Sequence, residues 1–367
     1  MSGMSVKTRL ICTIVMFGLA SLVSTNSTAQ SVTCTYTSFE AANTGPGSGA
    51  YGINRFDATV GTWADTSFNA HGFYRSPQGK IVRFSIPKAV NTYPQGINDR
   101  GTIVGYFQNV SDNSSANGFK IGDGEVSHIT YPGATYTEPH GINKKGDIVG
   151  WYALPNSPGA GFRLSGGQFS SFSYPGAAFA TVAWGINKSG EIVGMWEDSS
   201  INQSGFIYNH GQFQNVSYPG STGTLLTGVN DAGEISGYYL GPGPDQIPYG
   251  FVYSNGTFHP VNIPNTASNI VFGVNAKGDL AGVYQAVQFG NTPPSSEPTA
   301  IRLEASKENG SPVSRLFCEE HGAFLLISSS AKFLLRWRPR KSSAVSGGLL
   351  SASLNHAMQV CGRTLNI

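Results

Sequence analysis

The sequence predicts an all-β protein, and three observations carry that prediction. Glycine is abundant (47 of 367 residues), aromatic residues reach 11% and charged residues are only 12%, proportions that favour strands and turns. A stretch that is clearest at Gly141 to Tyr152 occurs six times, at intervals of 44, 45, 44, 43 and 45 residues. Each repeat holds four short strand patterns, which is typical of a β-propeller blade. The repeats begin at Gly52, Gly96, Gly141, Gly185, Gly228 and Gly273.

The fifth repeat shows the four expected strands in order. They span Leu225 to Asn230, Glu234 to Tyr239, Gly250 to Tyr253 and Thr257 to Ile263. The first two are joined by a short Asn-x-x-Gly turn and the last two by an Asn-Gly turn. We therefore expect an up-and-down antiparallel sheet in each repeat.

The turn between the first two strands has the same chemistry throughout. Asparagine can bond its own nearby backbone, and glycine follows where positive φ is required. The first repeat departs, because Asn54 is followed by Asp57, a residue type that also tolerates this conformation. The other turns start at Asn98, Asn143, Asn187, Asn230 and Asn275.

The sixth repeat loses the pattern after its first hairpin, Ile270 to Tyr284, and Ala300 to Leu303 is the nearest substitute for its third strand. We predict that Tyr36 to Phe39 supplies the fourth strand and closes a six-bladed ring, because an open last blade would expose unpaired backbone. The alternative takes the closing strands from the tail, with His321 to Leu326 paired to Lys332 to Arg338.

Several motifs resemble those of a known family. They are the Gly-Ile-Asn-x-x-Gly-x-Ile-Val-Gly signature, the His-Gly-Phe at His71 to Phe73, and Tyr-Pro-Gly closures such as Tyr131 to Gly133. Over about Tyr36 to Tyr284 the chain resembles secreted bacterial proteins with HAF-type extracellular repeats. The resemblance implies an exported propeller and supplies no catalytic residues. The equivalents of His71 are Asn117, Ala160, Ser204 and Tyr249, which argues that the histidine is not a required ligand.

The two ends differ from the repeats. Lys7 and Arg9, an apolar run from Leu10 to Val23, and small residues up to Ala29 predict a signal peptide at 1–29, too short for a membrane span. Residues 30–303 form the predicted repeat domain, and 304–367 an atypical basic extension that is disordered or binds a surface. The mature chain would keep three cysteines, which permits one disulfide of unknown pairing. They are Cys34, Cys318 and Cys361.

Candidate functional residues are expected on the face that carries the longer, variable loops. An acidic pair there, Glu197-Asp198, would suit hydrolysis, although adjacent side chains usually point apart. A ring of aromatic residues ending the second strands would either stack on sugars or pack between blades. The site candidates are Asp65, His140, Glu197, Asp198 and Asp245, with Asp112 beside them, and the aromatic residues are Trp63, Phe107, Tyr152, Trp196, Tyr239 and Tyr284.

The functional hypotheses remain of three classes. Even repetition without a reactive cluster favours a secreted or cell-surface, monomeric binding propeller without catalysis, whose ligand is a glycan or a surface protein. The alternatives are a carbohydrate-active lyase or hydrolase and a structural envelope protein. The net charge of +2 gives no reason to expect nucleic acid, and no cofactor or metal motif is found in the sequence.

Overall fold

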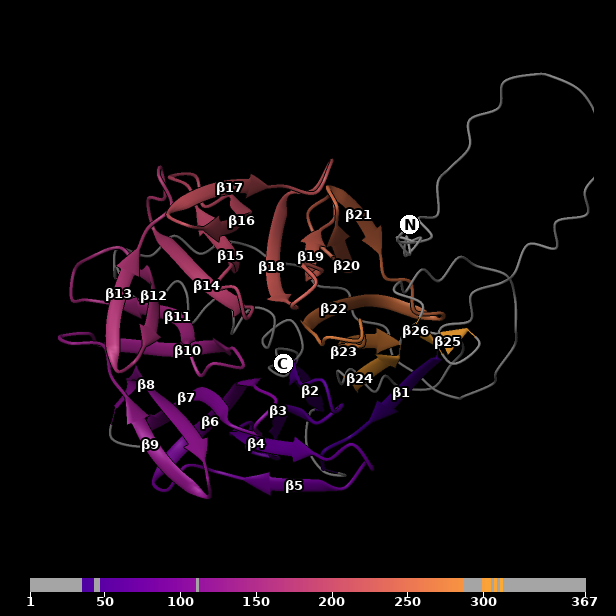
Figure 1. Ribbon diagram of the computed structural model, residues 1–367, viewed down its shortest axis with the longest axis horizontal. Coiled ribbons are helices and arrows are strands. Elements are labelled where there is room, and N and C mark those ends of the chain that lie inside the picture. The colour runs from indigo at the N-terminus through magenta and orange to yellow at the C-terminus, as the bar shows by residue number, and fades with distance from the viewer. Residues whose placement is uncertain are drawn as a thin grey trace, which may run out of the picture. The chain divides into compact units, whose positions relative to one another are not determined.

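We analysed a computed structural model, which describes residues 35–42, 47–109, 112–286, 299–304, 307–308 and 311–312. These residues form strands and turns, and the predicted all-β fold class is confirmed (Figure 1). Antiparallel pairings join the strands into six groups of four, here called units one to six. The signal peptide, the three cysteines and almost all of the predicted extension lie outside the described residues.

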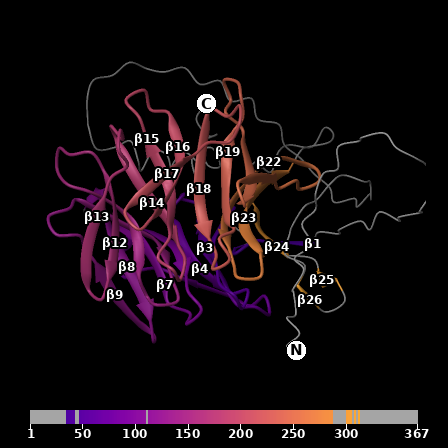
Figure 2. The same cartoon turned by 45° about the horizontal axis from the view of Figure 1, so that its top comes forward.

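Each unit presents one strand to the centre of the ring and three successively farther out (Figures 1 and 2). The innermost strands are β2 (Ser48–Ile53), β6 (Ala89–Ile97), β10 (Tyr136–Ile142), β14 (Ala180–Ile186), β18 (Gly223–Val229) and β22 (Thr266–Val274). The second strands are β3 (Thr59–Ala64), β7 (Ile103–Asn109), β11 (Ile148–Ala153), β15 (Ile192–Glu197), β19 (Ile235–Leu240) and β23 (Leu280–Ala286).

The third strands are β4 (Ala70–Arg75), β8 (Asp112–Gly122), β12 (Ala160–Ser165), β16 (Gln203–Asn209), β20 (Pro248–Ser254) and β24 (Thr299–Glu304). The outer strands are β5 (Ile81–Phe84), β9 (Glu125–Ile129), β13 (Gln168–Phe172), β17 (Gln212–Val216), β21 (Thr257–Pro260) and β1 (Thr35–Phe39). Two short strands, β25 (Lys307–Glu308) and β26 (Ser311–Pro312), pair with each other.

The predicted closure by the N-terminal strand is present. β1 pairs antiparallel with β24, so that Tyr36 lies opposite Leu303 and Phe39 opposite Ala300. Ile301 lies opposite Gly282 of the second strand. In the other five units, the residue opposite the equivalent glycine is the phenylalanine of the Gly-Phe pair, so Ile301 takes the place of that phenylalanine. Those phenylalanines, fully buried, are Phe73, Phe119, Phe162, Phe206 and Phe251. The alternative closure by the tail involves residues outside those described.

The turn asparagines do more than make turns, because they also join neighbouring units. In the third unit, Asn143 Oδ1 accepts the backbone N–H groups of Lys145, Gly146 and Asp147, while Asn143 Nδ2 donates to the Asn187 carbonyl at 3.1 Å. The corresponding bond is present at every junction, including Asn275 to Asn54 across the closure. We call this closed set the asparagine ring; all six side chains are buried.

The repeat glycines are required by close backbone approach between units. A Cβ on Gly141 would lie 2.6 Å from the Trp184 carbonyl oxygen, and one on Gly96 the same distance from that of His140. Neither glycine has positive φ, unlike the turn glycine Gly146, at φ 95°. The repeat glycine therefore sets how tightly the inner strands pack.

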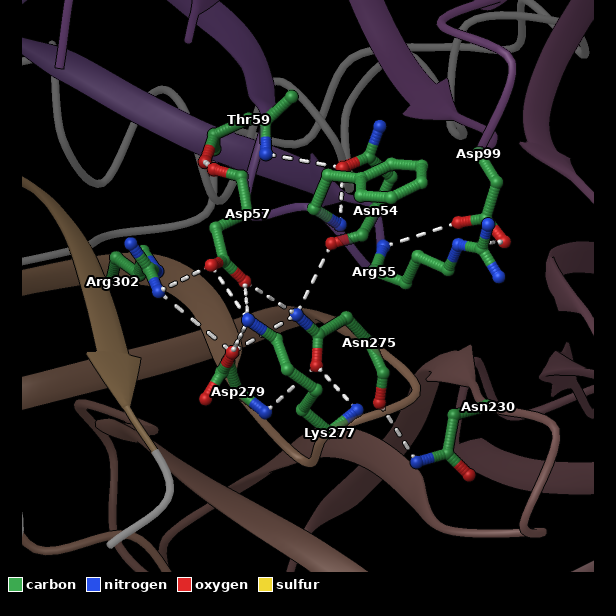
Figure 3. Close-up of polar contacts among 12 residues, drawn as sticks. Asn54, Arg55, Asp57, Thr59, Asp99, Asn230, Asn275, Lys277, Asp279 and Arg302 are labelled. Atoms are coloured by element: carbon green, nitrogen blue, oxygen red, sulfur yellow. Dashed lines mark hydrogen bonds and ion pairs between the residues drawn. The ribbon is translucent and has the colours of Figure 1, made fainter. Parts of the chain in front are cut away.

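The departure at Asp57 has a structural reason, visible in Figure 3. Asp57 adopts φ 69° in place of the turn glycine. Its carboxylate accepts Lys277 Nζ at 2.6 Å and pairs with Arg302 at 3.0 Å, both from unit six. Lys277 also lies 3.3 Å from Asp279. These four residues, the closure cluster, hold opposite charges together where the first and last units meet.

Candidate functional site

The residue before each repeat glycine differs in every unit. These six side chains, which we call the axial ring, are Tyr51, Gln95, His140, Trp184, Thr227 and Phe272. At each of them the pairing of the innermost strand with the second strand shifts register, so the residue forms a β-bulge. Bulges re-aim a side chain without ending the sheet. The scaffold thus holds six non-identical side chains in equivalent positions.

Contacts between units bring four of these side chains together around the ring's axis. Tyr51 of unit one packs on Phe272 of unit six, with ring centroids 4.7 Å apart. His140 of unit three stacks on Trp184 of unit four at 4.3 Å and 13°. One hydrophobic cluster draws buried residues from units one, three, four, five and six, an arrangement that only the centre of a ring permits.

Units two and three give the axis a polar side. Glu138 and His140 from β10 are both only 3% exposed, and their Oε2 and Nε2 atoms lie 3.6 Å apart. Tyr93 and Tyr106 stack on each other at 4.8 Å, and Tyr106 meets the His140 ring edge-on at 6.3 Å. A carboxylate, an imidazole and two phenols are therefore gathered with little contact to solvent.

Three polar atoms on or next to this side have no hydrogen-bond partner among the described residues: Gln95 Nε2, His140 Nε2 and, from neighbouring unit four, Trp184 Nε1. His140 Nδ1 faces the Ala183 carbonyl at 3.0 Å. Because a carbonyl only accepts, Nδ1 carries the proton, and Nε2 is left to accept from another group or to form an ion pair with Glu138. An unsatisfied buried polar group costs about 1–3 kcal/mol, so these atoms favour a polar ligand or water.

The phenols remain protonated donors or acceptors. Burial, with the charge of Glu138 adding to it, raises the pKa of Tyr93 well above its usual range. The pKa of Tyr106 is raised by burial and by Glu138, Tyr93 and Tyr51. Both hydroxyl groups are thus neutral throughout the physiological range and suited to hydrogen bonding.

Units four to six make the opposite side of the axis apolar. It is formed by buried side chains that pair across the first two strands, such as Val182 with Met195 and Leu225 with Tyr238. Ile270 and Phe272 extend it in unit six. The axis therefore offers hydrogen bonds on one side and an apolar, partly aromatic surface on the other.

The predicted site residue His140 is placed differently from expectation. We expected it on the long-loop face, but it is buried in β10 at the axis. The β-bulge at His140 turns the side chain toward the other axial residues. Sequence reasoning missed Gln95, Glu138 and Trp184. For Gln95 and Trp184 a signal was available, because the position before the repeat glycine varies while the glycine does not.

Asp65 is used by its own loop and by one histidine. Its carboxylate accepts the N–H groups of Ser67 and Asn69 and the Asn69 side-chain amide, and Oδ2 lies 3.1 Å from His71 Nε2. Burial alone would raise the pKa of Asp65. The hydrogen bonds, chiefly the one with His71, outweigh burial and lower this pKa to about 2. Asp65 is thus ionised at neutral pH.

Glu197 and Asp198 have separate partners. Glu197 is buried and accepts a hydrogen bond from Gln203 Nε2 at 2.9 Å. Burial raises the pKa of Glu197 and outweighs the opposing effect of this bond. Half-buried Asp198 accepts bonds from Ser200 and Asn202. These bonds, chiefly those from Asn202, lower the pKa of Asp198. Asp245 lies exposed in the loop before β20. Asp112 begins β8, with its side chain outside the described part.

Three of the second-strand aromatic residues pack between units. Tyr131 stacks on Tyr152 at 3.5 Å, Tyr174 on Trp196 at 4.2 Å and Tyr218 on Tyr239 at 3.7 Å. In each pair the first tyrosine belongs to a Tyr-Pro-Gly closure. The packing interpretation therefore applies to these positions.

Within the described ranges, no group of three or more His, Cys, Asp or Glu side chains is arranged to hold a metal ion. In the same part of the chain, no helix has the length and apolarity needed to cross a membrane.

Comparisons with known proteins find similarity only among solved structures. No family model matches the sequence, and no curated protein does. A fucose-specific lectin from Aleuria aurantia aligns with 10% identity and TM-score 0.41, over 62% of this chain and 84% of the lectin. TolB from Acinetobacter baumannii aligns with 11% identity and TM-score 0.46, over 69% and 65%. A gluconolactonase from Xanthomonas campestris aligns with 11% identity and TM-score 0.42, over 72% and 88%. At these levels the similarities carry no information about function.

Proposed function

We propose that this chain is an exported binding propeller that holds a small hydroxylated ligand, such as a sugar unit, at its axis. One observation supports it most: Gln95, His140 and Trp184, each with a buried polar atom that lacks a hydrogen-bond partner, belong to a ring whose six members all differ. A sugar suits this arrangement because its hydroxyl groups bond to polar partners while its C–H faces pack on aromatic rings.

Export and kinship belong to the same proposal. The basic start and apolar run at 1–29 support passage through a membrane, and the repeat motifs support membership of the bacterial HAF-repeat proteins. The ligand would then be met in the periplasm or at the cell surface. A surface glycan fits this setting and the amphipathic axis together.

The test uses two substitutions that remove donors without a hydrogen-bond partner, of which Gln95→Met nearly preserves the side-chain volume. Gln95→Met and Trp184→Phe are each expected to weaken binding of a soluble oligosaccharide at least tenfold, since each removes a hydrogen bond worth about 1.4 kcal/mol or more. Binding is measured by titration calorimetry across an oligosaccharide panel. Lys144→Ala, at an exposed turn position, serves as the control and should bind like the native protein.

The same variants distinguish a ligand site from a merely structural axis. Gln95→Met removes a buried N–H group that has no hydrogen-bond partner and nearly keeps the volume, so it should leave the free protein as stable as before or more so. Loss of binding together with loss of folding would contradict the proposal. So would an absence of binding by the native protein across the panel, or binding that neither axial variant alters.

A further inference from the structure

Unit one contains a chain of three side chains that the axial site does not use. Asp65 Oδ2 lies 3.1 Å from His71 Nε2, and His71 Nδ1 lies 2.8 Å from Ser85 Oγ. Asp65 follows β3, His71 lies in β4, and Ser85 directly follows β5. Three neighbouring strands thus align a carboxylate, an imidazole and a hydroxyl in hydrogen-bonding order.

The direction of the hydrogen bonds follows from the ionised carboxylate. An ionised Asp65 can only accept, so Nε2 of a neutral His71 must carry the proton and donate it. Nδ1 is then the acceptor, and the Ser85 hydroxyl donates to it. This is the polarity that a general base needs in order to take the proton of an attacking serine.

The surroundings of the three residues hold them and leave the hydroxyl accessible. The His71 ring packs on Trp63, its partner across the β3–β4 pairing, at a centroid distance of 4.7 Å. The Arg83 guanidinium carbon lies over the Trp63 ring, 5.5 Å from its centroid. Ser85 is exposed, and Arg83 is two residues before it, on the same side of the outer strand. A permanent cation therefore lies beside the stacked rings of Trp63 and His71.

Unit four has the same construction without the base. Trp196 and Asp198 stand where unit one has Trp63 and Asp65, and Asp198 makes the same loop bonds to the residues two and four positions later. Ser217 is the equivalent of Ser85, but Ser204 replaces His71 and lies 3.4 Å from Ser217 through the two hydroxyl oxygens. The chain therefore carries its own matched control.

We infer that Ser85, His71 and Asp65 form an acyl-transfer site for small esters, separate from the axis. Ser85 Oγ forms a bond to the ester carbonyl carbon as its proton passes to His71 Nδ1. The bond from that carbon to the alcohol oxygen then breaks, and the leaving alkoxide takes the proton from Nδ1. Water attacks the acyl-serine, His71 accepts a proton from it, and Ser85 regains its hydroxyl as the acid leaves. Asp65 is a positioning residue that holds the His71 tautomer.

The experiment labels the full chain with a fluorophosphonate, in which Ser85 Oγ forms a bond to phosphorus while fluoride leaves. Peptide mass spectrometry locates the label, and hydrolysis of p-nitrophenyl acetate follows turnover. We expect label at Ser85 at least tenfold above that at Ser217. Ser85→Ala and His71→Asn, the residue that unit two has at this position, should each lower both signals at least tenfold, whereas Ser217→Ala should change neither.

Two further variants keep the test independent of folding. Asp65→Asn preserves the loop, since asparagine makes the equivalent turns elsewhere. It should slow labelling and move the half-maximal labelling rate to lower pH, because it removes the negative charge beside the His71 ring and leaves the positive charge of Arg83. Ser204→His should introduce label at Ser217. Equal labelling of Ser85 and Ser217 in the native protein, or labelling of Ser85 that survives His71→Asn, would overturn the inference.

Discussion

The asparagine ring lies three residues after the axial ring, in the turns that directly follow the inner strands, yet the two rings differ in composition and in hydrogen bonding. The asparagine ring repeats one residue six times, and its polar side chains are bonded both within the turn and to the next unit. The axial ring has six different residues, and three of them have polar atoms without partners among the described residues. Identical, satisfied positions build the scaffold, whereas varied, unsatisfied positions are available for recognition.

The largest expected effect is on the asparagine ring. Asn143→Ala would leave the N–H groups of Lys145 and Asp147 without their partner. It would also remove the bond to the Asn187 carbonyl in the next unit, so the free energy of unfolding should fall by about 3 kcal/mol. Urea denaturation measures it. Asn143→Asp keeps the acceptor but loses the bond to the next unit and places a charge beside Asp147, so it should also destabilise. A native-like midpoint for both variants would show that the ring does not hold the units together.

The closure cluster should have the next largest effect. Asp57→Asn retains a residue that tolerates φ 69° but removes the charge facing Lys277 and Arg302, at a cost of about 2 kcal/mol. Asp99→Asn is the matched control, because the pair of Asp99 with half-exposed Arg55 at 3.5 Å should contribute less than about 0.5 kcal/mol. Equal losses in the two variants would contradict a special role for the closure.

The smallest expected effect carries a pH signature. Burial outweighs the Gln203 bond and raises the pKa of Glu197 above its usual 4.5, so ionisation of this carboxyl destabilises the fold as pH rises from about 4.5 through the raised value. Glu197→Gln keeps the Gln203 contact and should be more stable than native at pH 7, on the order of 1 kcal/mol. Thermal unfolding of the variant and the native protein, at pH 7 and below pH 4.5, checks this. The gain in stability should vanish below pH 4.5. A gain of equal size under both conditions would exclude the titration of Glu197 as its cause.

The repeat made the scaffold predictable from the sequence. The four strands of each unit, the Asn-x-x-Gly turns and the closure by Tyr36 to Phe39 follow from turn chemistry and from the need to cover a strand edge. The link from Asn143 to Asn187 did not follow, because a turn motif carries no information about its neighbour in space.

The candidate sites were harder to predict for a physical reason. His140 was associated with loops because it lies beside a repeat glycine, whereas a β-bulge turns it to the axis. The Asp65, His71 and Ser85 alignment joins three strands through register, and no short motif records that. The available signal was the single histidine that precedes a Gly-Phe pair. Because the other units have different residues at this position, we interpreted the histidine as not required.

The most direct test of the division between scaffold and site is a paired measurement on Gln95→Met. The unfolding free energy and the affinity for the best oligosaccharide of the panel are determined on the same preparation. We predict that stability is unchanged or rises by about 1 kcal/mol while affinity falls at least tenfold. A loss of stability with unchanged affinity would contradict the assignment of the axial ring to ligand binding.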